Sequence, residues 1–298
     1  MICIKPRRRH ALLALALTSV VAGSSATANP SPYPATAYPV EFEDVKALPV
    51  AQGPIPHAYG KAPSQYGLLW LPFGGEPAPL VMFIHGDCWL SDYSVEHIQP
   101  LASTLVRAGY AVWAPEYRRL GEDGGGWPGT FNDLRAALAA AATLRPGRVD
   151  ATRTVLAGHS AGGHLALWLA TREQPLASDV TLVGAVGLAP ITHLSTYQSL
   201  HDESGNRCAG SVARLLDGGP QTVPERYREA SPALAGDSGL RLQLLHGSAD
   251  DVVPLAQSRN MPNAGLEILQ GAGHYDLIHP GTEAFPALLR AIETVLSP

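Results

Sequence analysis

Several features are scarce in this sequence of 298 residues, and each scarcity excludes a class of protein. There are only 3 cysteines, too few for a small domain held together by disulfides. Past the N-terminus there is no run of about 18 consecutive apolar residues, which excludes an internal membrane span. The pI is near 6.1 and no basic block is present, which argues against nucleic acid as the main partner.

Apolar residues, in contrast, are abundant. They make up 46% of the chain, and the formal net charge is only −5, so the chain is not intrinsically disordered. Its length permits one large α/β domain or two small ones, with an ample core.

The first residues have the three parts of a secretory signal peptide. Four basic residues come first, an apolar run follows over 11–22, and Ala26 and Ala28 supply the small residues that a signal peptidase reads. We expect a signal peptide over 1–28, export to the periplasm or the extracellular medium, and no stable membrane insertion after cleavage. The alternative is a short membrane anchor, for which the apolar run is short.

Removal of this segment would change the composition of the working chain. About 270 residues remain, and the net charge becomes −9 because the removed segment holds four cations and no acids. Cys3 is lost, which leaves Cys88 and Cys208. In an oxidising compartment two remaining cysteines are candidates for a disulfide, with two separate thiols as the alternative.

Short apolar runs alternate with longer amphipathic ones after an extended, proline-rich lead-in over 29–65. They predict strands over 68–71, 80–84, 111–114, 154–157, 183–188, 240–245 and 266–269, and helices over 96–108, 131–144, 161–171 and 285–296. This alternation predicts an α/β domain over 66–298, with a mostly parallel sheet and helices on both faces. Residues 191–235 interrupt the alternation, which favours a small insertion or lid.

The sharpest motif is Gly158-His159-Ser160-Ala161-Gly162, which matches G-x-S-x-G. It follows a predicted strand and opens a predicted helix, and in that context the serine sits on a strained turn with its hydroxyl exposed. The helix N-terminus presents free N–H groups and favours negative charge. We therefore expect Ser160 to be a nucleophile; the alternative is an ordinary glycine-rich turn.

A serine nucleophile needs a base to take its proton and an acid to orient that base, in the chain order serine, acid, histidine. Asp250 follows the predicted strand 240–245, and His274 follows the predicted strand 266–269. Both residues therefore lie at the sheet edge where the sites of α/β proteins form. We expect His274 to be the base and Asp250 the acid.

The segment after the predicted strand 80–84 is the third part of the predicted active site, after the serine turn and the acid–histidine pair. A tetrahedral intermediate carries a negative oxygen that needs preorganised N–H donors. We expect these donors to come from Gly86, Asp87 and Cys88, and from Ala161, the residue after the nucleophile.

Ser160, Asp250 and His274, with the His85-Gly86 pair, resemble the α/β-hydrolases. The resemblance covers about 66–298 and is strongest to the carboxylesterase and hormone-sensitive-lipase-like group. Within that group it points to the kynurenine formamidase-like and feruloyl-esterase-like serine hydrolases. It implies a serine nucleophile, an oxyanion hole in the loop after His85-Gly86, and no metal or organic cofactor.

Two details of the sequence are judged against that family. Of the neighbours Asp250 and Asp251, the family pattern H-G-x-x-D-x-x-V-P assigns the acid role to Asp250. The family usually has a second glycine after His-Gly, and here that residue is Asp87. A carboxylate beside a developing oxyanion raises the barrier, so we expect Asp87 to point away, pairing with an arginine such as Arg118 or Arg119 or holding the loop.

These residues predict a serine hydrolase that cleaves small carboxylic esters through an acyl-enzyme. The second hypothesis is an arylformamidase, and the third is a prolyl-oligopeptidase-type exopeptidase. The rival of another class is a binding module that keeps the fold without efficient catalysis, which only Asp87 favours. The expected partner is a small-molecule ester or amide, and a Cys88–Cys208 disulfide would tie the oxyanion loop to the lid. No motif indicates an oligomeric state.

Overall fold

The computed structural model describes residues 1–2, 31–172, 179–204 and 206–297. The predicted signal peptide over 1–28 lies, apart from its first two residues, outside the described residues. No helix within the described ranges is long and apolar enough to cross a membrane.

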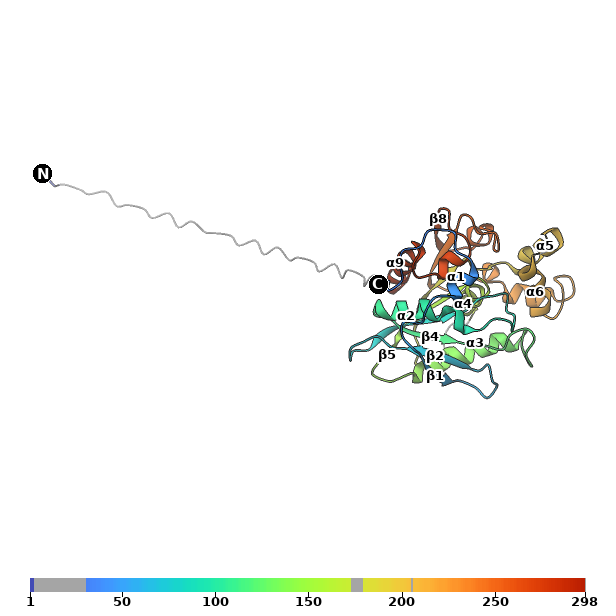
Figure 1. The fold of residues 1–298 in the computed structure, drawn as a ribbon, viewed down its shortest axis with the longest axis horizontal. Helices are drawn as coiled ribbons and strands as arrows, with labels where there is room; N and C mark the ends of the chain where they lie inside the picture. The colour runs from blue at the N-terminus through green and yellow to red at the C-terminus, as the bar shows by residue number, and fades with distance from the viewer. Residues whose placement is uncertain (3–30, 173–178, 205, 298) are drawn as a thin grey trace.

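An eight-stranded sheet forms the centre of the molecule, in the spatial order β1-β2-β4-β3-β5-β6-β7-β8 (Figure 1). The strands are β1 (Ile55–Ala58), β2 (Tyr66–Trp70), β3 (Ala78–Ile84), β4 (Ala111–Pro115), β5 (Val149–His159), β6 (Leu182–Leu188), β7 (Arg241–Gly247) and β8 (Ala264–Leu269). β2 runs antiparallel to both of its neighbours, and every other pair is parallel. The predicted, mostly parallel sheet is confirmed.

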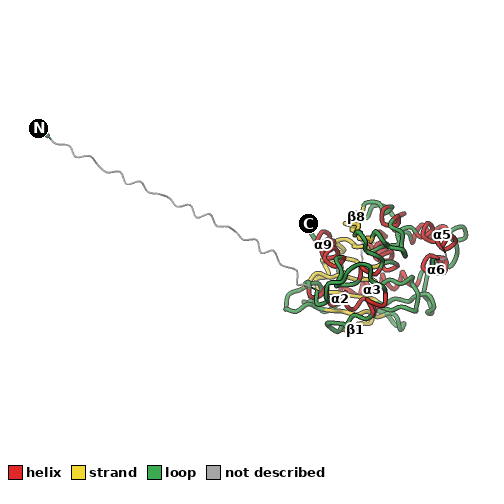
Figure 2. Tube along the Cα trace, turned by 45° about the horizontal axis from the view of Figure 1, so that its top comes forward, coloured by secondary structure: helices red, strands yellow, loops and turns green. Residues whose placement is uncertain are grey.

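Helices cover both faces of this sheet (Figure 2). The main ones are α2 (Gln99–Arg107), α3 (Gly129–Ala140), α4 (Ala161–Arg172) and α9 (Ala284–Leu296). Along β3, Leu80 and Met82 pack into the core shared with α3 and α4, whereas Val81 and Phe83 pack into the core shared with α2 and α9. Successive side chains of a strand point to opposite faces, so a sheet with two covered faces requires the continuous apolar runs seen in the sequence.

The predicted insertion over 191–235 is a group of short helices between β6 and β7. They are α5 (Leu194–Ser204), α6 (Arg207–Leu215), α7 (Pro224–Ala230) and the 3₁₀ helix η3 (Pro232–Leu234). α5 and α6 pack against each other and lie at one end of the molecule, beyond the edge of the sheet, in both ribbon views (Figures 1 and 2).

The lead-in over 29–65 differs from the extended segment that we expected. It contains the short helix α1 (Phe42–Lys46) and the edge strand β1, so the sheet begins at residue 55 and not at 66. Both elements are too short to show a hydrophobic period in the sequence. α1 packs against two 3₁₀ helices, η1 (Val95–Ile98) and η4 (Tyr275–Ile278), and Val45 is fully buried there. This segment is therefore part of the folded domain.

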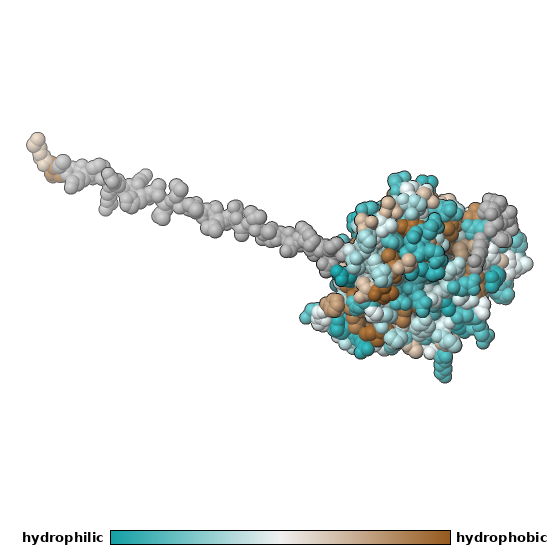
Figure 3. Space-filling view, viewed as in Figure 1, coloured by the Kyte–Doolittle hydropathy of each residue, from teal (hydrophilic) through white to brown (hydrophobic). Residues whose placement is uncertain are grey.

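The surface in Figure 3 is mainly hydrophilic, with apolar residues between the polar ones. From residue 31 onward, the large apolar side chains that are exposed in the described ranges are Val50, Phe73 and Leu234. They are distant in sequence, and scattered apolar residues are normal on a globular surface.

Candidate active site

Ser160 lies on the tight turn between β5 and α4. Its φ is +56°, a left-handed conformation that a residue with a Cβ rarely adopts. The surrounding glycines allow this turn to fit, because a Cβ at Gly158 would lie 2.3 Å from the carbonyl oxygen of Gly162. A Cβ at Gly162 would lie 2.1 Å from the carbonyl oxygen of Ile84. Close backbone packing among β3, β5 and α4 therefore holds the serine in its strained position.

Asp250 and His274 meet at the carboxyl edge of the sheet, after β7 and β8. His274 Nδ1 donates to Asp250 Oδ2 at 2.7 Å, and the backbone N–H groups of Val252 and Val253 donate to Oδ1 at 2.9 and 2.8 Å. Burial alone would raise the pKa of Asp250, but His274 and these hydrogen bonds hold it below its ordinary value. Asp250 is therefore ionised, and its neighbour Asp251 is exposed to solvent.

Two buried histidines fix the loops that carry these residues. His159 Nε2 donates to the backbone oxygen of His274 at 3.0 Å, which joins the serine turn to the histidine loop. His246 Nε2 donates to the carbonyl oxygen of Val253 at 2.9 Å, within the loop of Asp250. Burial lowers the pKa of both rings, so they are neutral and serve as hydrogen-bonding groups.

The predicted serine and histidine are not joined directly. Among the described residues, no hydrogen bond links the hydroxyl of Ser160 to His274. Such bonds are often long in the absence of substrate and shorten in the reacting complex. The described part of the chain also contains no group of three or more His, Cys, Asp or Glu side chains that could hold a metal ion.

Loop 85–89 lies beside the serine turn, where a Cβ on Gly86 would be 3.2 Å from the Cβ of Ser160. The backbone N–H groups of Gly86, Asp87 and Cys88 make no hydrogen bond with any other described residue. The N–H of Ala161, at the first position of α4, has no partner within the helix. Within the described residues, none of the four predicted donors is therefore taken up by a hydrogen bond.

The backbone of this loop is strained. Asp87, Cys88 and Trp89 have φ values of +74°, +60° and +58°, three consecutive non-glycine residues in the left-handed region. Each such residue costs roughly 1–2 kcal/mol. Side-chain anchors oppose this cost: Trp89 Nε1 donates to Nδ1 of His164 at 3.3 Å, and Cys88 is bonded to Cys208.

The disulfide joins two distant parts of the chain. Cys88 is in loop 85–89 and Cys208 is in α6 of the insertion, 120 residues further along, with their Cα atoms 4.7 Å apart. The loop is therefore tied covalently to the insertion. A link over so long a loop is expected to stabilise the fold by about 4 kcal/mol.

Asp87 does not pair with either of the arginines that we expected, and that expectation was wrong. Arg118 and Arg119 are both engaged by other acids: Arg118 by Asp133 at 2.7 Å, and Arg119 by Glu116 at 3.1 Å and Glu122 at 3.0 Å. Glu116 and Glu122 lie three residues from Arg119, whereas Asp133 lies 15 residues from Arg118, on α3. The carboxylate of Asp87 instead faces His97, with Oδ2 at 3.2 Å from Nε2.

Glu116, at the end of β4, is a buried residue that we did not identify individually from the sequence. Its Oε1 lies 2.7 Å from His85 Nε2, and its Oε2 accepts from the N–H of Val95 at 2.9 Å. Burial raises the pKa of Glu116, but His85 and Arg119 outweigh that effect and hold it below the ordinary value. This carboxylate fixes loop 85–89 to the start of η1. In the sequence, only the run 116–119 draws attention to Glu116, and that run does not show which residues the side chain contacts.

The strained turn at Ser160 and the Asp250–His274 pair at the carboxyl edge of a mostly parallel sheet are typical of an α/β-hydrolase fold. The BD-FAE family model matches residues 69–264, so the chain belongs to the BD-FAE family of this superfamily. The match ends before His274, and β1 and α1 precede it.

The chain is also similar to proteins that are named as esterases. The chain is 27% identical over 250 residues to Esterase LipC of Mycobacterium tuberculosis (strain ATCC 25618 / H37Rv). The matched region covers 74% of this chain and 59% of that protein. It thus spans about three fifths of that relative's length. Esterase B from Lactobacillus rhamnosis (HN001) superimposes with a TM-score of 0.69 at 20% identity, over 86% of this chain and 90% of that one. A truncated carbohydrate esterase from gut microbiota gives 0.67 at 20% identity, over 83% and 96%. At these identities the structures share the fold.

Proposed function

We propose that this protein is a serine hydrolase that cleaves small carboxylic esters through an acyl-enzyme. The observation that carries the proposal is the 2.7 Å hydrogen bond between Asp250 and His274, at the edge of the sheet that also holds Ser160 on its strained turn. Membership of the BD-FAE family and the esterase names of its relatives support the ester as the substrate class.

His274 acts as the general base in this mechanism. Because Nδ1 is engaged with Asp250, the other ring nitrogen is left to take the proton of the Ser160 hydroxyl as Oγ attacks the ester carbonyl. Asp250 then stabilises the imidazolium. The proton passes to the departing alcohol, and water, activated by the same histidine, hydrolyses the acyl-enzyme.

Loop 85–89 stabilises the negative oxygen of the tetrahedral intermediates. The donors are the N–H groups of Gly86, Asp87, Cys88 and Ala161. They have no hydrogen-bond partner among the described residues, and the strained loop and the helix start hold them in place. One preorganised donor is worth about 3–4 kcal/mol of barrier.

A fluorophosphonate probe tests the shared chemistry. We expect it to label the wild-type protein at Ser160 and not to label Ser160→Ala, which should also lose at least about 10³-fold in kcat. Failure of the folded wild-type protein to react would contradict the proposal and support a binding module.

A substrate panel tests the class. p-Nitrophenyl esters of short acids are expected to be the best substrates, ahead of N-formylkynurenine and X-Pro anilides. If the formamide gives the highest kcat/KM, the protein is an arylformamidase. If the anilide does, it is an exopeptidase.

We further propose that the protein is exported and processed near Ala28. The signal pattern of the sequence and the disulfide between Cys88 and Cys208 support this, because disulfides persist in oxidising compartments. N-terminal sequencing of the protein recovered outside the cytoplasm should begin near residue 29. Recovery of an unprocessed chain with free thiols in the cytoplasm would contradict export.

A further inference from the structure

Asp87 places a carboxylate in the loop that is to stabilise an oxyanion. The side chain is only 7% exposed, so water does little to solvate its charge. A fixed negative charge near a developing oxyanion opposes the reaction that the neighbouring N–H groups favour. A group in the protein must therefore direct and neutralise this carboxylate.

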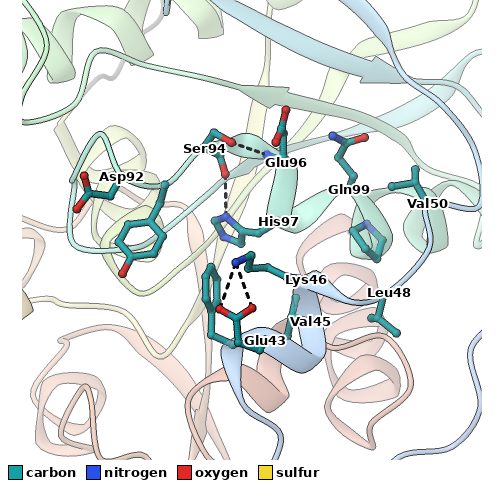
Figure 4. Close-up of a pocket in the computed structure, with 13 residues that line it drawn as sticks. Glu43, Val45, Lys46, Leu48, Val50, Asp92, Ser94, Glu96, His97 and Gln99 are labelled. Carbon is teal, nitrogen blue, oxygen red and sulfur yellow. Dashed lines mark hydrogen bonds and ion pairs between the residues drawn. The ribbon is translucent and has the colours of Figure 1, made fainter.

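His97, from η1, is placed to do so. Its Nε2 lies 3.2 Å from Oδ2 of Asp87, close enough for an ion pair. Within the described part of the chain, neither atom makes a hydrogen bond, with each other or with any other group. On the other side of the ring, Nδ1 lies 2.8 Å from the carbonyl oxygen of Ser94 (Figure 4). Since a carbonyl oxygen only accepts, Nδ1 carries a hydrogen.

The hydrogen on Nδ1 determines how many protons His97 and Asp87 must hold between them. A neutral ring protonated at Nδ1 would turn the lone pair of Nε2 toward the carboxylate, and such a contact at 3.2 Å is repulsive. One additional proton shared by the two groups makes the contact attractive and the pair neutral. Burial lowers the pKa of His97, and the charge of Asp87 opposes that shift in part.

Among the described residues, the cations near this point are engaged with other acids. Lys46, which lines the same cavity as His97, pairs with Glu43 at 3.1 Å (Figure 4). Arg118 and Arg119 are engaged with other acids. The titratable groups that face the pair are His85, Glu116, Tyr117, His159 and Tyr275. His85 and Glu116 are paired with each other at 2.7 Å.

α1 encloses His97 from outside. The ring of Phe42 packs edge-on against it, with centroids 5.5 Å apart, and both residues line a cavity of about 470 Å³ between α1 and η1 (Figure 4). His97 is 4% exposed, so its interaction with Asp87 is only weakly screened by water. The lead-in thus shields the histidine that faces loop 85–89.

We propose that His97 is a positioning residue of the hydrolysis: it turns the carboxylate of Asp87 away from the acyl oxygen and, through one shared proton, keeps loop 85–89 electrically neutral. The inference rests on the proposed function. It explains how the loop accommodates an acid at the position where the carboxylesterase group that the sequence resembles usually has glycine.

A double-mutant cycle tests this role. His97→Asn keeps a donor near the carbonyl of Ser94 and removes the ring atom that faces Asp87. We expect kcat for a p-nitrophenyl ester to fall roughly 10- to 100-fold, with KM changed less than about threefold. In the Asp87→Asn background the same substitution should change kcat less than about twofold, because no charge remains to be neutralised.

Equal losses in the two backgrounds would show a purely structural role and overturn the inference, as would an undiminished kcat in His97→Asn. His97→Gln can still donate to Asp87 but carries no charge, so its kcat should fall less than that of His97→Asn. If His97→Asn does not fold, His97→Gln replaces it in the double-mutant cycle. Titration of Ser160 with the fluorophosphonate normalises each rate to the competent fraction. If the wild-type protein neither labels nor hydrolyses esters, the proposed function fails; if it does both and the cycle shows no coupling, this inference alone fails.

Discussion

The turn at Ser160 and loop 85–89 are both strained, but they are held by different means. Around Ser160, the close approach of backbone to backbone requires glycine at Gly158 and Gly162. Loop 85–89 has three left-handed residues with full side chains, and partners from distant elements hold them. Strain in the first turn is therefore maintained by close packing of backbone on backbone, whereas strain in the second is maintained by side-chain links to distant elements.

The largest expected effect tests the backbone packing that holds the turn at Ser160. Gly162→Ala would place a Cβ 2.1 Å from the carbonyl oxygen of Ile84, and that backbone is fixed in β3. Alanine favours helices by about 1 kcal/mol, but the clash should outweigh this and cost about 4 kcal/mol or more of unfolding free energy. Guanidinium unfolding measures it. Gly53→Ala, with no atom within 4 Å of the added Cβ, is the control and should be nearly neutral.

The next effect tests the covalent anchor of loop 85–89. Cys208→Ser should lower the unfolding free energy by about 4 kcal/mol. It should also reduce kcat more than it raises KM, because the N–H donors lose their fixed positions. Dithiothreitol should have the same effect on the wild-type protein and none on Cys208→Ser. An unchanged kcat after complete reduction would show that the other anchors suffice.

The smallest effect concerns the hydrogen bond of Trp89. Burial lowers the pKa of its acceptor, His164, to about 4 from 6.5. The unfolded chain therefore binds this proton more readily, so the stability contributed by the neutral ring is complete above pH 6.5 and is lost as the pH falls toward 4. The loss should reach about 3 kcal/mol.

Unfolding free energies at pH 7 and pH 4.5 measure the contribution of neutral His164 to stability. The decrease between them should be smaller in His164→Asn than in the wild-type protein. His57→Asn, on the edge strand β1, is the matched control and should retain the wild-type decrease. If both variants behave alike, His164 does not account for the acid sensitivity.

The same contrast explains what could be predicted from the sequence. The strands, the helices and the position of Ser160 follow from hydrophobic runs and from one motif whose residues are adjacent in the chain. Asp250 and His274 follow because parallel strands end at the same sheet edge. The structure places these two side chains in contact, as the chain order indicates.

Other features depend on contacts that no local pattern encodes. His164 is 75 residues from Trp89, and its role appears only when α4 packs beside loop 85–89. His97 is near Asp87 in the chain, but arginine is the commoner partner of a buried carboxylate, and only the structure shows that the arginines are already paired. The strand β1, with four residues, is too short for its alternation to be significant.

The disulfide also has a topological consequence. The bond between Cys88 and Cys208 closes a covalent ring of the chain that contains Ser160, whereas Asp250 and His274 lie outside it. A protease that cuts once within the ring leaves the polypeptide in one covalent piece, and the serine stays attached to loop 85–89. A cut between Cys208 and Asp250 instead separates the acid and the base from the nucleophile. The consequence of a backbone cut therefore depends on whether it falls inside or outside this covalent ring.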